Sequence, residues 1–155
     1  MSPHEAAIVA AARSWIGTPY RHQASLRGIG CDCLGLLRGV WREIVGAEPE
    51  HPGPYRPDWA EAGGRERLLA AAARHLVPVA GPEPGPGRVL IFRWRDGLPA
   101  KHCAIATDAG HMVHAHDGAS VAEVALSGWW RRHLAASFDF PAPLQPVAPK
   151  EGFRR

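Results

Sequence analysis

In the first half of the chain, apolar side chains recur at the three- and four-residue spacing of an amphipathic helix. The pattern predicts three helices, over residues 3 to 16, 33 to 45 and 65 to 76. Ser2, Pro3 and Glu5 form the capping signature of the first helix. Proline and glycine are frequent after the second helix, so residues 46 to 58 should be irregular.

In the second half the apolar spacing changes to a period of two, which is typical of strands. Strands are predicted over residues 89 to 94, 102 to 107, 111 to 116, 119 to 125 and 135 to 140. Short turn sequences separate neighbouring strands, which favours an antiparallel meander. The segment 81 to 87, rich in glycine and proline, should be a seam between two layers of one domain. Helices followed by an antiparallel sheet predict an α+β fold, with one domain over 1 to 141 and a loosely ordered tail over 142 to 155.

Composition narrows the class of protein. The chain has 155 residues and a net charge of +3, and only Arg131-Arg132 and Arg154-Arg155 are paired arginines, so we expect no nucleic-acid partner. No apolar run approaches the roughly 20 residues that span a membrane, and the N-terminus lacks the layout of a secretory signal. We therefore expect a protein made in the cytoplasm that does not insert in a membrane. Three cysteines, an odd count, argue against a disulfide framework.

A thiol stands where the second predicted helix begins. Cys33 falls in the first turn, where unpaired backbone N–H groups and the helix dipole stabilise a thiolate. Asp32 is a good N-cap, and it would place Cys31 outside the array of free N–H groups. A single cysteine is more often a small buried hydrophobe than a nucleophile. Cys33 is nevertheless the candidate for a reactive thiol.

A reactive thiol needs a base, and the predicted strands carry histidines. If the second and third strands pair, His102 and His114 become neighbours, so that one could act on Cys33 and the other could orient it. Alternation places Cys103 on the strand face opposite His102, where it should be buried and inert. Nine histidines are present, so most of them are incidental.

Five ordered blocks of sequence carry a family resemblance. They are Trp15-Ile16-Gly17-Thr18-Pro19-Tyr20-Arg21, Asp32-Cys33-Leu34-Gly35-Leu36, Pro86-Gly87-Arg88-Val89-Leu90-Ile91-Phe92, His102-Cys103-Ala104-Ile105-Ala106 and Val113-His114-Ala115. In order and spacing the chain resembles the NlpC-type cell-wall cysteine peptidases. The resemblance implies a minimal papain-like fold that hydrolyses amide bonds in peptidoglycan stem peptides, typically between D-γ-glutamate and diaminopimelate.

Carried over by residue, the resemblance makes Cys33 the nucleophile, His102 the general base and His114 the residue that orients His102. Tyr20 matches a tyrosine beside the active site, and Asp32 is a second neighbour. No cofactor and no metal are expected.

Three departures from the family pattern affect substrate choice. Leu34 stands where serine is common, Arg88 replaces an aspartate, and His22-Gln23 replaces a pair of glycines. They leave the mechanism intact.

Further features resemble the branch encoded by prophages and gene transfer agents, including the insert over 49 to 64 and the ending Phe138-Asp139-Phe140-Pro141. The resemblance implies partners among phage-like tail or baseplate proteins and a place in a virion tail that acts on the cell wall. Such a particle would deliver the protein without a signal peptide.

Three alternatives remain open from sequence. Cys31, Cys33, His102, His114 and His116 could instead hold a metal such as zinc. The protein could be a non-catalytic structural component of a tail. The same cysteine and histidine could also catalyse acyl transfer or another amidase reaction.

Overall fold

The structure is a computed structural model that describes residues 1–60, 62–81 and 83–144. Its helices are α1 (Pro3–Arg13), α2 (Cys33–Ile44), α3 (Arg67–His75) and α4 (Gly128–His133), with a short 3-10 helix over Ala62–Gly64. Its strands are β1 (Ser25–Leu26), β2 (Gly30–Cys31), β3 (Val77–Pro78), β4 (Val89–Phe92), β5 (His102–Asp108), β6 (His111–His114), β7 (Ala122–Ala125) and β8 (Leu134–Asp139). The α+β class predicted from sequence is confirmed.

The main sheet has six antiparallel strands in the order β3-β8-β4-β5-β6-β7. Strands β4 to β7 form the predicted meander. The last strand, β8, returns across the sheet to pair with β4, and the two-residue β3 pairs with the outer side of β8. The sheet therefore begins before the glycine- and proline-rich seam, a feature that the two-layer reading of the sequence did not predict.

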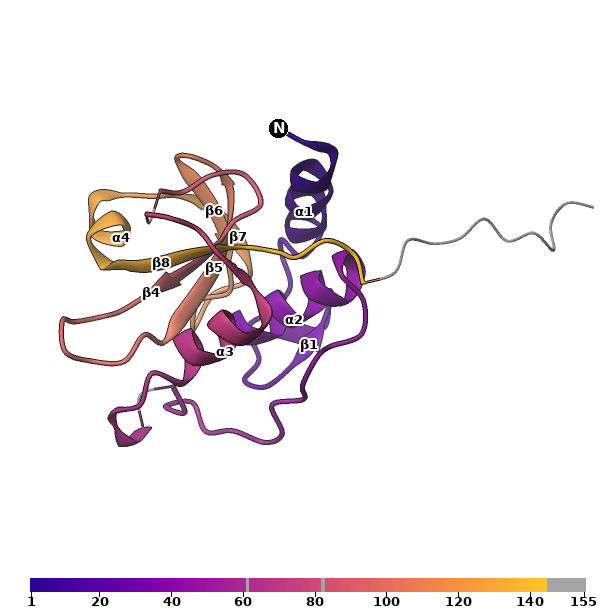
Figure 1. The fold of residues 1–155 in the computed structure, drawn as a ribbon. Helices are drawn as coiled ribbons and strands as arrows, with labels where there is room; N and C mark the ends of the chain where they lie inside the picture. Colours follow the sequence, from indigo (N-terminus) through magenta and orange to yellow (C-terminus); the bar gives the residue numbers. More distant parts are fainter. Residues whose placement is uncertain (61, 82, 145–155) are drawn as a thin grey trace, which may run out of the picture.

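Helices cover the two faces of the sheet unequally (Figure 1). The larger core joins one face to α1, α2 and α3 through Ile8, Leu36 and Leu68, and Cys103 and Ile105 of β5 belong to it. The smaller core lies on the opposite face, where Phe92 and Met112 pack with Trp130 of α4. Strand β5 thus contributes alternate side chains to two separate cores, as its period of two requires.

Local sequence accounts for the two main helices. In α1 the Ser2 side chain accepts from the Glu5 backbone N–H and the Glu5 side chain accepts from the Ser2 N–H, which completes the predicted capping box. Trp15, in the turn that follows α1, packs against α2 at Gly39, where an added Cβ would lie 2.0 Å from the Trp15 ring. Only glycine at this position lets the Trp15 ring approach α2 so closely.

The observed boundaries differ from the predicted ones in identifiable ways. The first helix ends at Arg13 because residues 14 to 17 form a turn, in which Gly17 has φ 91°. Strand β6 ends at His114, so His116 lies in the loop that follows it. Helix α4 was not predicted from sequence. Most of the predicted tail, residues 145–155, lies outside the described residues, in which no helix is long and apolar enough to cross a membrane.

Candidate active site

The predicted nucleophile, Cys33, is the first residue of α2. Asp32 is the N-cap with extended backbone (φ −99°, ψ −175°), and its Oδ1 accepts a hydrogen bond of 2.7 Å from the Gly35 N–H. Gly35 must be small because an added Cβ would lie 1.9 Å from the Ala24 carbonyl oxygen. The half-buried Cys33 therefore lies within the first turn, where free N–H groups favour an anion.

The two predicted histidines form a direct pair. His102 begins β5 and His114 ends β6, and His102 Nε2 lies 2.9 Å from His114 Nδ1, with both side chains buried. Burial, followed by the charge of His102, lowers the pKa of His114 to about 3, so the ring is neutral near pH 7. A neutral His114 can accept a hydrogen bond at Nδ1 from the Nε2–H of His102. This arrangement leaves Nδ1 of His102 for the thiol.

The surroundings of Cys33 favour its thiolate. A hydrogen bond from the Cys103 side chain, followed by a hydrogen bond and positive charge from His102, holds the pKa of Cys33 well below its usual range, although burial opposes this. The cysteine, the histidine pair and the helix start together can support nucleophilic attack followed by protonation of a leaving group.

Cys103 is buried, as predicted, and its Sγ donates to the Cys33 carbonyl oxygen at 3.3 Å. The hydrogen bond to Cys33 and burial raise the pKa of Cys103 well above its usual range, so it stays a neutral thiol. Strand alternation predicted that Cys103 and His102 face opposite ways, and they do: Cys103 belongs to the larger core, and His102 lies against Phe92 and Trp130 on the other face. The strand pattern gave no sign that both side chains interact with Cys33, which lies beside the start of β5.

The third cysteine, Cys31, is fully buried in β2. Burial, followed by the charge of Asp32, raises the pKa of Cys31 to about 12. The three thiols therefore differ sharply in pKa and in burial, and only Cys33 combines a lowered pKa with partial exposure.

The two predicted neighbours, Tyr20 and Asp32, lie close to the nucleophile. Tyr20 forms an isolated bridge with Cys31, and burial, followed by the charge of Cys33, raises the pKa of Tyr20 to about 12. Asp32 is buried, and its Oδ2 accepts hydrogen bonds from the Tyr55 hydroxyl at 2.5 Å and the Gln23 N–H at 2.8 Å. Burial is the main cause of a raised pKa for Asp32.

The Tyr55 hydrogen bond fastens the irregular insert to the start of α2. His22 Nε2 lies 2.6 Å from the Tyr55 carbonyl oxygen, and the Gln23 side-chain amide also donates to that oxygen. His22 and Gln23 replace a pair of glycines in the family pattern, and the insert is a second departure from that pattern. The two departures are therefore in contact through Tyr55. Sequence alone gave no sign that these two features contact each other.

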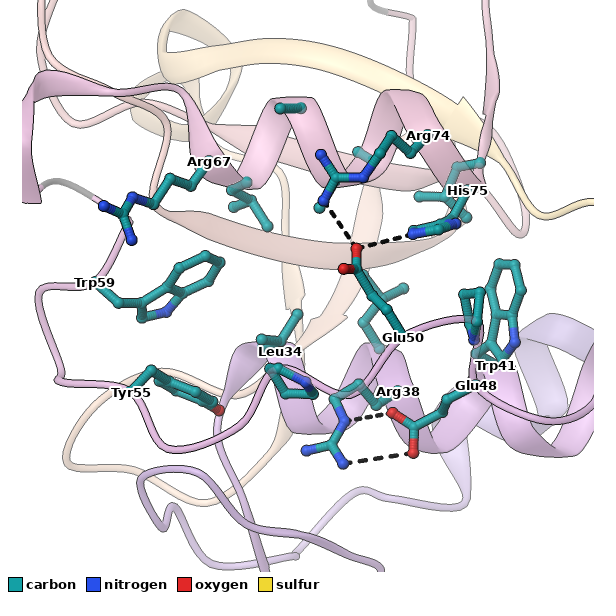
Figure 2. A pocket seen from close by; sticks show the side chains of 18 of the residues that line it. Leu34, Arg38, Trp41, Glu48, Glu50, Tyr55, Trp59, Arg67, Arg74 and His75 are labelled. Atoms are coloured by element: carbon teal, nitrogen blue, oxygen red, sulfur yellow. Dashed lines mark hydrogen bonds and ion pairs between the residues drawn. The ribbon is translucent and has the colours of Figure 1, made fainter.

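A pocket of about 1110 Å³ lies between α2, α3 and this insert (Figure 2). Leu34, the residue after the nucleophile, contributes to its wall, as do Tyr55 and Trp59, whose ring centroids are 5.6 Å apart. Ion pairs brace the rim: Glu48 binds Arg38, and Glu50 binds Arg74 and His75. The pocket adjoins the start of α2, so it can hold a group attached to a substrate at Cys33.

A wall of indole rings surrounds the histidine pair. Trp94 stacks on His102 with 5.6 Å between ring centroids, and Trp130 lies 5.5 Å from His102 and 5.2 Å from His114. The Trp129-Trp130 pair is evident in the sequence, but no local pattern predicts that α4 packs Trp130 against the two histidines. These rings restrict how His102 and His114 can turn.

Of the five residues in the metal alternative, three come together. His102, His114 and His116 each offer a ring nitrogen, and these atoms lie within 4.8 Å of one another. Neither Cys31 nor Cys33 belongs to this group among the described residues.

Neither a scan against protein-family models nor a search of curated proteins found a match. Solved structures do match. The NlpC/p60 domain of the peptidoglycan hydrolase SagA has a TM-score of 0.59 at 24% identity, covering 88% of this chain and 98% of that one. An NLP/P60 family protein similar to a lipoprotein, from Staphylococcus aureus, has a TM-score of 0.58 at 20% identity, covering 90% of this chain and 42% of that one. A Bacillus cereus NlpC/p60 family protein has a TM-score of 0.59 at 18% identity, covering 88% and 40%.

The fold is therefore that of NlpC/p60 domains. The chain spans about two fifths of the staphylococcal and Bacillus proteins. At these identities the likeness concerns the fold, and the chemistry rests on the side chains described above.

Proposed function

We propose that the protein is a cysteine endopeptidase that hydrolyses amide bonds in peptidoglycan stem peptides. The observation that carries this proposal is Cys33 at the N-terminus of α2, beside the hydrogen-bonded pair His102 and His114. The NlpC/p60 fold supports it, because the matched domain of SagA is described as part of a peptidoglycan hydrolase.

In the proposed reaction the Cys33 thiolate attacks the stem-peptide carbonyl, and the His102 imidazolium protonates the leaving amine. The neutral His114 accepts from His102 Nε2–H and holds the ring so that Nδ1, the nitrogen that gives up and takes back the proton, faces Cys33. Backbone N–H groups of the first turn of α2 are candidate donors to the developing oxyanion. Water then attacks the acyl-enzyme, and His102 takes up its proton to restore the starting state.

The scissile bond that we propose is D-γ-glutamyl-diaminopimelate. A γ-linked glutamate keeps its α-carboxylate free, at the opposite end of its side chain from the scissile carbonyl. Arg67 of α3 lines the pocket (Figure 2) and is exposed, with no ion-pair partner among the described residues. Its guanidinium suits a carboxylate of the bound stem peptide.

We further propose that the protein acts in the tail of a phage or gene transfer agent particle during wall penetration, with tail or baseplate proteins as partners. The support for this placement is the resemblance of the insert and the chain ending to that branch. Insert residues such as Tyr55 and Trp59 also line the pocket, and Tyr55 is held by its hydrogen bond to Asp32, which gives these residues a place in substrate recognition.

Mass spectrometry of fragments released from purified peptidoglycan tests the proposed reaction and the bond together. The expected products carry a new amino terminus on diaminopimelate, and the Cys33→Ala protein should release none. Wall preparations that lack diaminopimelate serve as the matched control. No release of amino groups from any wall would contradict the proposal.

A further inference from the structure

A third histidine lies beside the proposed catalytic pair. His116 takes no part in the reaction proposed above, yet its ring centroid is 5.6 Å from those of both His102 and His114. One ring nitrogen from each of the three lies within 4.8 Å of the others. The side chain of His116 is exposed, so this cluster opens to solvent on one side.

The sheet register explains why the three rings meet. Strands β5 and β6 pair Ile105 with Val113 and Ala106 with Met112. Continued toward the strand ends, the same register sets position 104 opposite 114 and position 102 opposite 116. All three histidines therefore project from the sheet face that carries the indole rings of Trp94 and Trp130.

We propose that His102, His114 and His116 form a binding site for a divalent transition metal of the zinc class. Imidazole nitrogens favour zinc, copper and nickel over calcium and magnesium. Three histidines leave one coordination position for water, a common arrangement for zinc. The ion is a reversible ligand here, and the proposed hydrolysis does not require it.

The geometry is close to what zinc needs. Tetrahedral zinc with bonds of about 2.0 Å holds its nitrogen ligands roughly 3.3 Å apart. The His102 and His114 nitrogens are already 2.9 Å apart, and the exposed His116 can rotate inward to close the rest. Of the charged groups nearby, Asp117 and the Cys33 thiolate favour a cation at His116, whereas the ammonium of Lys101, 5.3 Å from the centre of the Trp94 ring, opposes it.

Metal binding would block the proposed reaction, a consequence that rests on the proposed function. A His102 nitrogen bound to zinc cannot also donate to His114, and a metal-bound imidazole cannot become the imidazolium that protonates the leaving amine. Zinc should therefore inhibit the hydrolase reversibly, and a chelator should restore its activity.

Cobalt(II) absorption spectroscopy on the purified, chelator-treated full chain tests the site directly. We expect one Co²⁺ per chain with visible bands of a tetrahedral nitrogen and oxygen site, displaced by Zn²⁺. His116→Asn should weaken binding about 100-fold. His111→Asn is the matched control, because His111 is an exposed histidine at the other end of β6 that pairs with Asp108, and the affinity of this variant should equal that of the parent. Equal affinity of the parent and His116→Asn proteins would overturn the proposal.

A second measurement with Co²⁺ distinguishes the three-histidine site from a site in which Cys33 is a metal ligand. Cys33→Ser should bind Co²⁺ as the parent does, and no thiolate-to-cobalt charge-transfer band should appear. A charge-transfer band that disappears in Cys33→Ser would place the metal on Cys33 and refute the three-histidine site. Spectra need no hydrolase activity, so failure of the metal site and failure of the proposed function are distinguishable.

Inhibition is measured as the ratio of rates with and without Zn²⁺ in each variant. The parent and His111→Asn proteins should lose activity at the zinc concentrations that fill the site, and His116→Asn should require about 100-fold more. Equal zinc sensitivity of all three proteins would show that inhibition occurs elsewhere.

Discussion

The candidate catalytic residues at the start of α2 and the pocket beside them rest on different kinds of structure. The candidate catalytic residues lie on regular elements, a helix start and two paired strands, and indole rings enclose the histidines. The pocket wall instead includes an irregular insert held at Tyr55 by side-chain hydrogen bonds. Rigid elements suit a fixed reaction geometry, and an irregular segment suits a recognition surface that can change between related proteins. This division predicts that substitutions in the first region change kcat, and that substitutions in the second change KM.

The largest effect should come from the base. His102→Ala removes the group that protonates the leaving amine in the proposed reaction, so kcat should fall about 10³-fold or more with little change in KM. The measurement is steady-state release of amino groups from a soluble stem-peptide substrate. A His102→Ala enzyme as active as the parent would remove His102 from the mechanism.

A smaller loss of kcat is expected at His114, which acts through His102. His114→Ala should lower kcat about 100-fold, and His114→Asn, whose side-chain oxygen can accept from His102 Nε2–H, should recover part of that loss. A merely structural role would predict equal damage from both substitutions. Thermal unfolding of both variants is the control.

In the pocket, Arg67→Gln should raise KM about fivefold and leave kcat unchanged, because an exposed guanidinium binds a carboxylate weakly. The matched control is Arg132→Gln on α4, across the sheet from the pocket, which should change neither constant. A fall in kcat without a change in KM would break the proposed division between the two regions.

The contact that joins the two regions should contribute to stability. Tyr55→Phe deletes the hydroxyl that donates to the buried Asp32, so the free energy of unfolding should fall by about 1 kcal/mol. Urea denaturation measures it. An unchanged denaturation midpoint would mean that Tyr55 does not fasten the insert.

The features that could be predicted from sequence are those set by local patterns, and the features that could not are those set by tertiary contacts. Cys33 and Asp32 were placed correctly because capping and helix periodicity are local, and strand alternation placed His102 next to His114. The approach of Cys103 to Cys33 depends on how α2 docks against β5, which no local pattern states. The return of β8 to β4, the contacts of α4 with the histidines and the hold of His22 on Tyr55 are likewise tertiary. Such contacts join residues that are far apart in the chain, and the spacing of apolar residues carries information only about local structure.

The central claim is that Cys33 is a thiolate held at the start of α2, and its alkylation rate as a function of pH tests that claim most directly. Because the pKa of Cys33 is lowered, the thiolate persists as the pH falls below the ordinary range of a cysteine, and reactivity is lost only below the lowered value. With chelator present to exclude metal, peptide mapping after iodoacetamide treatment at pH 6 should find Cys33 modified first, in step with loss of activity. Labelling of Cys31 or Cys103 before Cys33, or a Cys33 rate that rises only near pH 9, would contradict the account.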